Sequence, residues 1–325
     1  MDEAGNRQKA KGNREESRLG RTGLEARGAG LGAPSPHPAA LPPASGPPPV
    51  TAPEVLASKG KRRLVMVTAT DEPSGRVADA AGVDLVLVGD SLAMTALGRP
   101  DTLSVTMDEM VHHTRAVAAG VRRALLVADM PFGSYQAAVA DAVRNACRLV
   151  AEGGAQAVKL EGARGEEIAA IARAGVPVVA HLGLTPQSFH RFGGYRVQAR
   201  AVREALELVA QGEALQEAGA FLLVLEAIPA AVAELATRRL AIPTIGIGAG
   251  AACDGQVLVW ADLLGLSVGP APRFVRRYAE LGRIARDAVA AFAEDVRNGS
   301  YPAETECYPA SPGLALELEK RLRRA

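Results

Sequence analysis

The chain has 325 residues, of which 48% are hydrophobic, so it is long and apolar enough to bury one large core. Its 37 Lys and Arg residues nearly balance its 36 Asp and Glu residues, and the formal net charge is +1. No global field therefore favours nucleic acid or an acidic membrane. We expect small molecules or further copies of the same chain as partners.

Cysteine content and apolar patterning indicate the compartment. Cys147, Cys253 and Cys307 are odd in number and lack the paired C-x-x-C spacing of a zinc site, which is typical of a reducing compartment. No apolar stretch approaches the roughly 20 residues that a membrane helix needs. The N-terminus has no apolar segment of the signal-peptide kind. We expect a cytoplasmic protein.

Residues 1–55 differ in composition from the rest of the chain. A charged, Gly-rich stretch is followed by a Pro-rich one, and such a segment cannot bury enough apolar surface to offset its ordering entropy. Its acidic residues distinguish it from an organelle transit peptide. We predict a disordered extension over residues 1–55 and a catalytic domain with a C-terminal helix and tail over residues 56–325.

From Arg63 onward, apolar runs alternate with stretches of helical periodicity. Helices are predicted over residues 107–119, 136–152 and 201–218, with a closing helix over residues 274–298. Eight strands are predicted, centred near Val65, Val86, Val127, Val158, Val179, Val224, Ile245 and Leu266. Glycines that end helices are predicted at Gly82, Gly154, Gly175 and Gly219. Eight βα units favour a (β/α)₈ barrel over an open doubly wound sheet.

Carboxylates stand at the ends of several apolar runs. Asp90, Asp129 and Glu161 end the second, third and fourth runs, which are neighbours round a barrel, and active sites collect at this rim. Three converging carboxylates repel one another unless a cation lies between them, and oxygen ligands suit Mg²⁺. We predict a magnesium site formed by these three residues. For any one of them, a helix N-cap is the alternative.

Other polar residues flank the predicted ligands. Lys159 precedes Glu161 by two residues, so both side chains face the barrel interior, where an ammonium group needs a carboxylate or a bound anion. Ser91, directly after Asp90, can hydrogen-bond a substrate carboxylate. His181, at the end of the fifth strand, can donate a hydrogen bond to an oxyanion or ligate the metal. The alternatives are a structural ion pair, a helix cap and a satisfied core histidine, respectively.

Glu226 ends the sixth strand, across the predicted mouth from the magnesium ligands. A carboxylate there can remove a proton from a carbon next to a metal-polarised carbonyl. An ion pair with an arginine is the alternative. The G-x-G-x-G run at residues 246–250 departs from the dinucleotide fingerprint, and we interpret it as tight turns beside the ligand.

Over about residues 59–302, the order of these motifs resembles one family, ketopantoate hydroxymethyltransferase, also called 3-methyl-2-oxobutanoate hydroxymethyltransferase. The segments that carry the resemblance are Leu87-Val88-Gly89-Asp90-Ser91, Asp101-Thr102-Leu103, Ala128-Asp129-Met130-Pro131-Phe132, Val158-Lys159-Leu160-Glu161-Gly162, His181-Leu182-Gly183-Leu184-Thr185-Pro186-Gln187-Ser188, Phe192-Gly193-Gly194-Tyr195, Leu223-Val224-Leu225-Glu226 and Ile245-Gly246-Ile247-Gly248-Ala249-Gly250.

The resemblance implies a Mg²⁺-dependent (β/α)₈ barrel. Its expected activity transfers a hydroxymethyl unit from 5,10-methylenetetrahydrofolate to 3-methyl-2-oxobutanoate, giving 2-dehydropantoate (ketopantoate) for pantothenate and coenzyme A biosynthesis. The implied site comprises metal ligands Asp90, Asp129 and Glu161, oxoacid contacts Asp90, Ser91, Asp129, Lys159 and His181, and the base Glu226. A homodecamer is also implied. No folate-contacting residue is predicted.

Three positions depart from the family's pattern: Thr70 stands where tyrosine is usual, Arg99 where histidine or tyrosine is commoner, and Ala261 where histidine is expected. None belongs to the predicted magnesium site. One alternative function is another Mg²⁺-dependent barrel that acts on 2-oxo acids as a lyase or mutase, although such enzymes commonly carry a catalytic cysteine loop. The other is a non-catalytic paralogue, which the retained acid cluster argues against.

Overall fold

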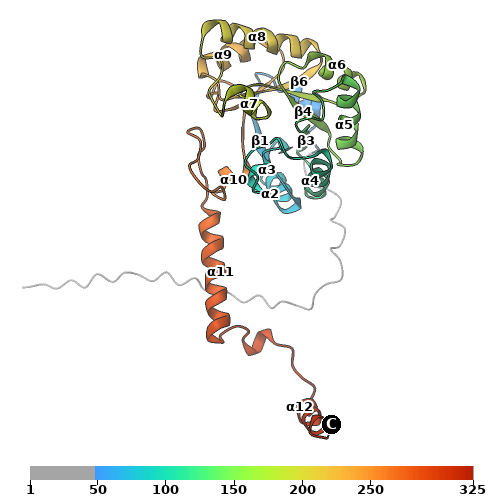
Figure 1. The fold of residues 1–325 in the computed structure, drawn as a ribbon, viewed down its shortest axis with the longest axis vertical. Coiled ribbons are helices and arrows are strands. Elements are labelled where there is room, and N and C mark those ends of the chain that lie inside the picture. Colours follow the sequence, from blue (N-terminus) through green and yellow to red (C-terminus); the bar gives the residue numbers. More distant parts are fainter. Residues whose placement is uncertain (1–47, 325) are drawn as a thin grey trace, which may run out of the picture. The chain divides into compact units, whose positions relative to one another are not determined.

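The computed structural model describes residues 48–324, which contain a closed barrel of eight parallel strands (Figure 1). Each strand pairs with the next along the chain, and the last pairs with the first. The strands are β1 Leu64–Thr68, β2 Leu85–Val88, β3 Leu125–Asp129, β4 Ala157–Glu161, β5 Val178–Gly183, β6 Ala220–Glu226, β7 Thr244–Ile247 and β8 Gly255–Leu258. The predicted (β/α)₈ barrel is confirmed.

Helices alternate with the strands. They are α1 Ala52–Ala57, α2 Glu72–Ala80, α3 Leu92–Thr95, α4 Met107–Gly120, α5 Val139–Ala151, α6 Gly165–Arg173, α7 Phe189–Phe192, α8 Val202–Glu217, α9 Ala230–Arg239, α10 Trp260–Leu263, α11 Leu281–Asn298 and α12 Leu314–Leu322, with 3₁₀ turns η1 Pro186–Ser188 and η2 Glu304–Glu306. The predicted helix-ending glycines all have positive φ, which confirms them: Gly82, Gly154, Gly175 and Gly219.

The core has two layers. Inside the barrel, alternate strand residues such as Leu85 and Leu87 pack together. The opposite faces of the strands pack against the surrounding helices through residues such as Val86 and Leu126. Because both faces of strands β2 to β7 are buried, these strands are nearly continuous apolar runs instead of alternating ones.

The N-terminal segment joins the inner layer. Val50 and Val55 are buried there, and Thr51 caps α1 by accepting a hydrogen bond from the backbone N–H of Glu54. The chain therefore packs against the barrel from Val50 onward, earlier than the predicted boundary at residue 55. The rest of the predicted disordered extension, residues 1–47, lies outside the described residues.

The last strand differs from the prediction. The strand predicted near Leu266 is wrong, because β8 ends at Leu258 and Leu266 follows α10 with 41% of its surface exposed. Gly265, with φ of 69°, turns the chain out of α10. The real strand has only four residues, and Gly255 belongs to it because a Cβ at that position would overlap the backbone of Leu64. The predicted closing helix begins at Leu281 instead of residue 274.

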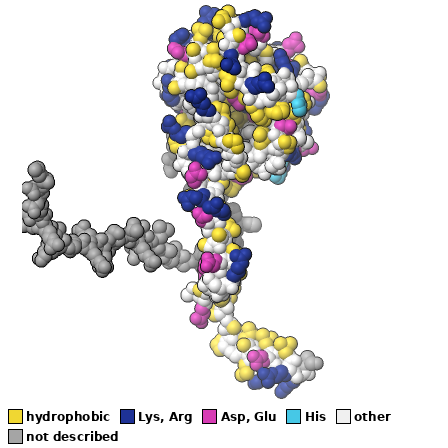
Figure 2. Space-filling view, turned by 60° about the vertical axis from the view of Figure 1, so that its left-hand side comes forward, with side chains coloured by type: hydrophobic (Ala, Val, Ile, Leu, Met, Phe, Trp, Pro, Cys, Tyr) yellow, Lys and Arg dark blue, Asp and Glu magenta, His cyan; other side chains and the backbone are white. Residues whose placement is uncertain are grey.

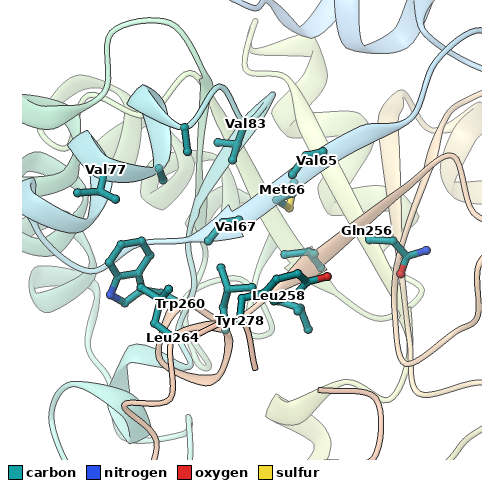
Figure 3. Close-up of a pocket in the computed structure, with 14 residues that line it drawn as sticks. Val65, Met66, Val67, Val77, Val83, Gln256, Leu258, Trp260, Leu264 and Tyr278 are labelled. Carbon is teal, nitrogen blue, oxygen red and sulfur yellow. The ribbon is translucent and has the colours of Figure 1, made fainter. Parts of the chain in front are cut away.

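An apolar groove lies over the outer side of β1 and β8, between α2 and α10 (Figure 3). Val67, Val83, Trp260 and Tyr278 are among the side chains that line it. The helix α11 follows Tyr278 in the chain, yet none of its own residues is buried. Within the described chain, this groove and the apolar side of α11 are therefore both uncovered.

The surface carries both signs of charge. Figure 2 shows Lys and Arg side chains interspersed with Asp, Glu and hydrophobic side chains on one face, as the near-neutral composition leads one to expect. Among the helices of residues 48–324, none combines the length and the apolar character needed to cross a membrane.

Candidate active site

The barrel's alternation places several charged side chains on its inner side. Asp129 continues the inward series of Leu125 and Val127, and Lys159 and Glu161 follow Ala157 in the same way. In the strand register, Asp129 pairs with Lys159, Glu161 with His181, and Gly183 with Glu226. The inner residues are apolar toward the amino ends and polar at the carboxyl ends, where the predicted site residues from β3 to β6 meet.

Lys159 is the central cation of this cluster. Its Nζ lies 2.9 Å from Asp129 Oδ1 and 3.9 Å from Glu161 Oε1, and all three side chains are at most 5% exposed. It also lies 3.2 Å from His181 Nδ1. Burial opposes the charged form of Lys159, but the neighbouring carboxylates raise its pKa above the ordinary value. The predicted pairing of this ammonium with carboxylates is present in the structure.

Asp90 adds a third buried carboxylate. Its backbone N–H donates to Asp129 Oδ2 over 3.1 Å. Burial and then the charges of Asp129 and Glu161 raise the pKa of Asp90 well above its usual value, and burial raises that of Asp129. The pKa of Glu161 is lowered despite its burial, because His181 and Lys159 stabilise its charged form. A cation among these carboxylates would therefore reduce the repulsion of Asp90 by Asp129 and Glu161.

The carboxylate oxygens of this cluster decide whether Mg²⁺ suits the site. Asp129 Oδ1 is buried and receives no hydrogen bond of ordinary geometry, although the Lys159 ammonium is close to it. Within residues 48–324, no group of three Asp, Glu, His or Cys side chains is arranged to hold a metal ion by itself. Carboxylate oxygens suit Mg²⁺, which usually retains water or substrate oxygens in its shell. Asp90, Asp129 and Glu161 thus have the donor chemistry that Mg²⁺ binds, and the magnesium site stays a prediction.

His181 joins this cluster to Glu226. Its Nδ1 lies 3.6 Å from Glu161 Oε1, and its Nε2 lies 3.3 Å from Glu226 Oε2. Burial and Lys159 disfavour the imidazolium, but Glu161 and Glu226 raise the pKa of His181 to about 9. The Glu226 side chain is 17% exposed, against 3% for His181. Among the described residues, the partner of Glu226 is thus a histidine and not an arginine.

Ser91 lies beside the carboxylates, close to Gly89 and Asp129. A Cβ on Gly89 would lie 3.0 Å from Ser91 Oγ and 3.6 Å from Asp129 Oδ2. Ser91 is the residue before α3, but its side chain makes no capping hydrogen bond there. The structure therefore offers no support for the helix-cap alternative.

Two buried polar residues of the site had no predicted role. Gln187 Nε2 donates to Asp90 Oδ2 and to Met130 O, both over 2.9 Å, and its backbone N–H donates to Glu161 Oε2 over 3.0 Å. The Tyr135 hydroxyl donates to Gln187 Oε1 over 2.6 Å. These bonds hold two of the three carboxylates in position. Gln187 lies in one of the segments that carry the family resemblance, just after the fifth strand, but no role was predicted for it.

Comparisons of sequence identify the family and relatives of this chain. The profile of the family described as "Ketopantoate hydroxymethyltransferase" matches residues 49–304. A 3-methyl-2-oxobutanoate hydroxymethyltransferase of Nitratidesulfovibrio vulgaris (strain DP4) is 55% identical over 267 residues, covering 82% of this chain and 87% of that protein. A 3-methyl-2-oxobutanoate hydroxymethyltransferase of Koribacter versatilis (strain Ellin345) is 50% identical over 283 residues, and the match covers 85% of this chain and 95% of that protein.

Solved structures share the fold at low identity. A phosphonopyruvate hydrolase solved with oxalate and Mg²⁺ is 17% identical with a TM-score of 0.51, covering 84% of this chain and 97% of its own. A phosphoenolpyruvate phosphomutase from Streptomyces platensis gives a TM-score of 0.51 at 18% identity with the same coverage. These likenesses support the barrel alone, whereas the sequence matches extend over most of the chain. The chain belongs to the ketopantoate hydroxymethyltransferase family.

Proposed function

We propose that this protein transfers a hydroxymethyl group from 5,10-methylenetetrahydrofolate to 3-methyl-2-oxobutanoate, giving 2-dehydropantoate for pantothenate and coenzyme A biosynthesis. Family membership supports the reaction class. The observation that carries the mechanism is the pairing of Glu226 with His181 beside a buried cluster of three carboxylates. A base and an anion-rich ligand set at one barrel mouth suit proton removal next to a polarised carbonyl.

In this proposal Asp90, Asp129 and Glu161 hold Mg²⁺. The bound ion supplies positive charge that makes the C3 hydrogen of the oxoacid more acidic. Lys159 stabilises negative charge on the substrate oxygens through its ammonium group, and Ser91 donates a hydrogen bond to the substrate carboxylate. The proposed role of Lys159 depends on its remaining charged, which its carboxylate neighbours favour.

Glu226 is the proposed base. It takes the C3 proton, and the resulting carbon nucleophile attacks the methylene carbon of the folate. Both C–N bonds of that carbon break as a C–C bond to C3 and a C–O bond to one water form, which leaves the carbon as CH₂OH. The C3 proton and one proton of the water end on the two nitrogens of tetrahydrofolate. His181 Nε2 lies 3.3 Å from Glu226 Oε2, so in this proposal the histidine holds the base in position before substrate arrives.

We also propose that the chain acts as a homo-oligomer, the decamer implied by the resemblance. Support comes from the open groove over β1 and β8 (Figure 3) and from α11, whose apolar side chains Ile284, Val289 and Phe292 are each more than half exposed. Exposed apolar surfaces of this kind mark protein interfaces. We assign the groove to α11 of a second copy. The cytoplasmic location expected from the sequence stays a prediction.

The decisive experiment is an assay of the purified full chain with 3-methyl-2-oxobutanoate, 5,10-methylenetetrahydrofolate and Mg²⁺. We expect 2-dehydropantoate by mass spectrometry, and its loss with chelator and recovery on adding Mg²⁺ back. A parallel measurement without folate follows exchange of the C3 hydrogen in deuterated water, which isolates proton removal from group transfer. Absence of product under every condition would exclude the proposed transferase activity.

A further inference from the structure

The connection between β5 and α8, residues 184–201, is fastened to the proposed base. Its first residue, Leu184, donates its N–H to Glu226 O over 2.8 Å, and near its other end Gln198 donates to Ala227 O over 3.0 Å. This connection carries η1 and α7 (Figure 1). Both of its ends are therefore held beside the residue that removes the proton.

Backbone strain is concentrated at the same anchor. Ala199 has φ of 55° and Ala227 has φ of 46°, and they are the two non-glycine residues with positive φ in the part of the chain described. Both are buried. Alanine rarely adopts this conformation, and such strain persists where surrounding structure fixes it, commonly at ligand sites. The connection is held in one particular shape, so the side chains it presents have defined positions.

The connection presents an aromatic pair toward the rim. Tyr195 is 46% exposed, and its ring centroid lies 5.0 Å from that of Phe189. The Tyr195 hydroxyl lies 3.5 Å from the sulfur of Met94 on α3, which begins two residues after Asp90. Partial burial and then the charges of Asp101 and Asp90 raise the pKa of Tyr195. The ring thus lies between the β5 and β2 connections, close to the carboxylate cluster.

Two arginines accompany this pair. Arg191, in the last turn of α7, and Arg196, next to Tyr195, are exposed, and neither has an ion-pair partner among residues 48–324. A half-exposed aromatic ring on the same connection as two guanidinium groups without ion-pair partners among residues 48–324 suits a ligand that combines an aromatic heterocycle with carboxylates. Reduced folates have this combination, because the pterin ring is joined through p-aminobenzoate to one or more glutamates.

We propose that the connection of residues 184–201 is the folate site, with Tyr195, backed by Phe189, stacking on the pterin ring and Arg191 and Arg196 binding the glutamate carboxylates. The proposal rests on the proposed function, because it requires a folate donor. It explains why the connection is anchored to Glu226: the methylene carbon of the donor must arrive next to the carbon from which Glu226 removes a proton.

Direct binding tests the site. Calorimetry on the full chain uses 5-formyltetrahydrofolate, a stable reduced folate, as mono- and triglutamate. We expect Tyr195→Ala to raise the Kd at least about tenfold, since stacking on an aromatic ring is lost, and Tyr195→Phe to bind like the unmodified chain. Arg191→Ala and Arg196→Ala should remove the preference for the triglutamate. Tyr308→Ala, an exposed tyrosine of the tail, is the matched control.

The outcomes separate the two proposals. Unchanged Kd values for Tyr195→Ala and both arginine variants would overturn the folate site, as would no folate binding by the unmodified chain. Loss of oligomeric mass in Tyr195→Ala with an unchanged Kd would assign the aromatic pair to a contact between copies and overturn the site as well. If the Kd values follow the expected pattern but the unmodified chain does not exchange the C3 hydrogen, the folate site is supported and the proposed transferase activity is contradicted.

Discussion

In the proposed mechanism, Lys159 and Glu226 have two different ionisable roles within one site. The pKa of Lys159 is raised by the carboxylates round it, so its ammonium stays charged and has no free pair of electrons to accept a proton. Glu226 has His181 as its charged neighbour and is more exposed than the inner carboxylates. Accessibility to substrate and freedom from the metal ligands both favour Glu226 as the base.

Glu226→Gln tests this assignment. The amide keeps the size of the side chain but cannot accept the C3 proton, so we expect exchange of that hydrogen with deuterated water to fall by about 10²–10⁴-fold. Binding of Mg²⁺ and oxoacid should persist. Proton NMR of 3-methyl-2-oxobutanoate in deuterated water measures the exchange. Glu234→Gln on the surface of α9 is the control, and exchange at the unmodified rate in Glu226→Gln would exclude Glu226 as the base.

Asp129→Ala tests the magnesium ligands. The substitution removes the carboxylate whose Oδ1 lacks a hydrogen bond and leaves the buried Lys159 ammonium with less compensation. We expect Mg²⁺ affinity, measured by calorimetry, to fall at least about tenfold. A thermal melt checks that the variant is folded. Asp141→Ala on α5 should bind Mg²⁺ normally, and equal affinity in Asp129→Ala would remove Asp129 from the ligand set.

At the level of elements, alternation made most of the site predictable. The two-residue period of β4 put Lys159 and Glu161 on one side of the sheet, where the structure has them. Gln187 was not predictable, because its amide reaches Asp90, 97 positions away in the sequence, through the closure of the barrel. Strand β8 was misplaced because a four-residue strand with a glycine has a weaker apolar signal than the run that ends near Leu266.

Arg99, one of the positions that departs from the family's pattern, ties the β2–α4 connection to α4. Its guanidinium pairs with Glu109, and its Nη1 also donates to Ser104 O over 2.9 Å. The hydrogen bond from Arg99 and then that from the Thr106 backbone lower the pKa of Glu109 to about 2. The arginine therefore has a structural partner of its own, away from the carboxylate cluster.

This pair predicts a defined acid dependence of stability. A carboxylate whose pKa is lowered by folding stabilises the native state above its unfolded pKa of 4.5, and this contribution is lost as the pH falls toward 2. At pH 7 we expect Glu109→Gln to melt about 2 °C lower than the unmodified chain. The difference in melting temperature between the two proteins should decrease as the pH falls from 5 to 3. Scanning calorimetry measures it, with Glu207→Gln on α8 as control; a constant gap would contradict the assignment.

At the scale of the whole molecule, one part of the barrel's outer wall is left open by the residues that the structure describes, 48–324. It is the groove over β1 and β8, lined by Val67, Trp260 and Tyr278 among others. The helix that follows, α11, has an apolar stripe at helical spacing and no buried residue. In the proposed oligomer, α11 of a second copy covers this groove and buries its own apolar stripe at the same time.

This arrangement predicts that α11 controls assembly. Replacing Ile284 and Phe292 on the apolar stripe by Glu places charge where the second copy's groove should be dry, so we expect the mass from light scattering to fall toward that of one chain. Arg286→Ser on the opposite side of α11 should leave the mass unchanged. Tyr278→Glu, in the groove itself, should dissociate the assembly in the same way, because an interface between copies fails when either surface is altered. Retention of full mass in both the stripe and the groove variants would show that the copies meet elsewhere.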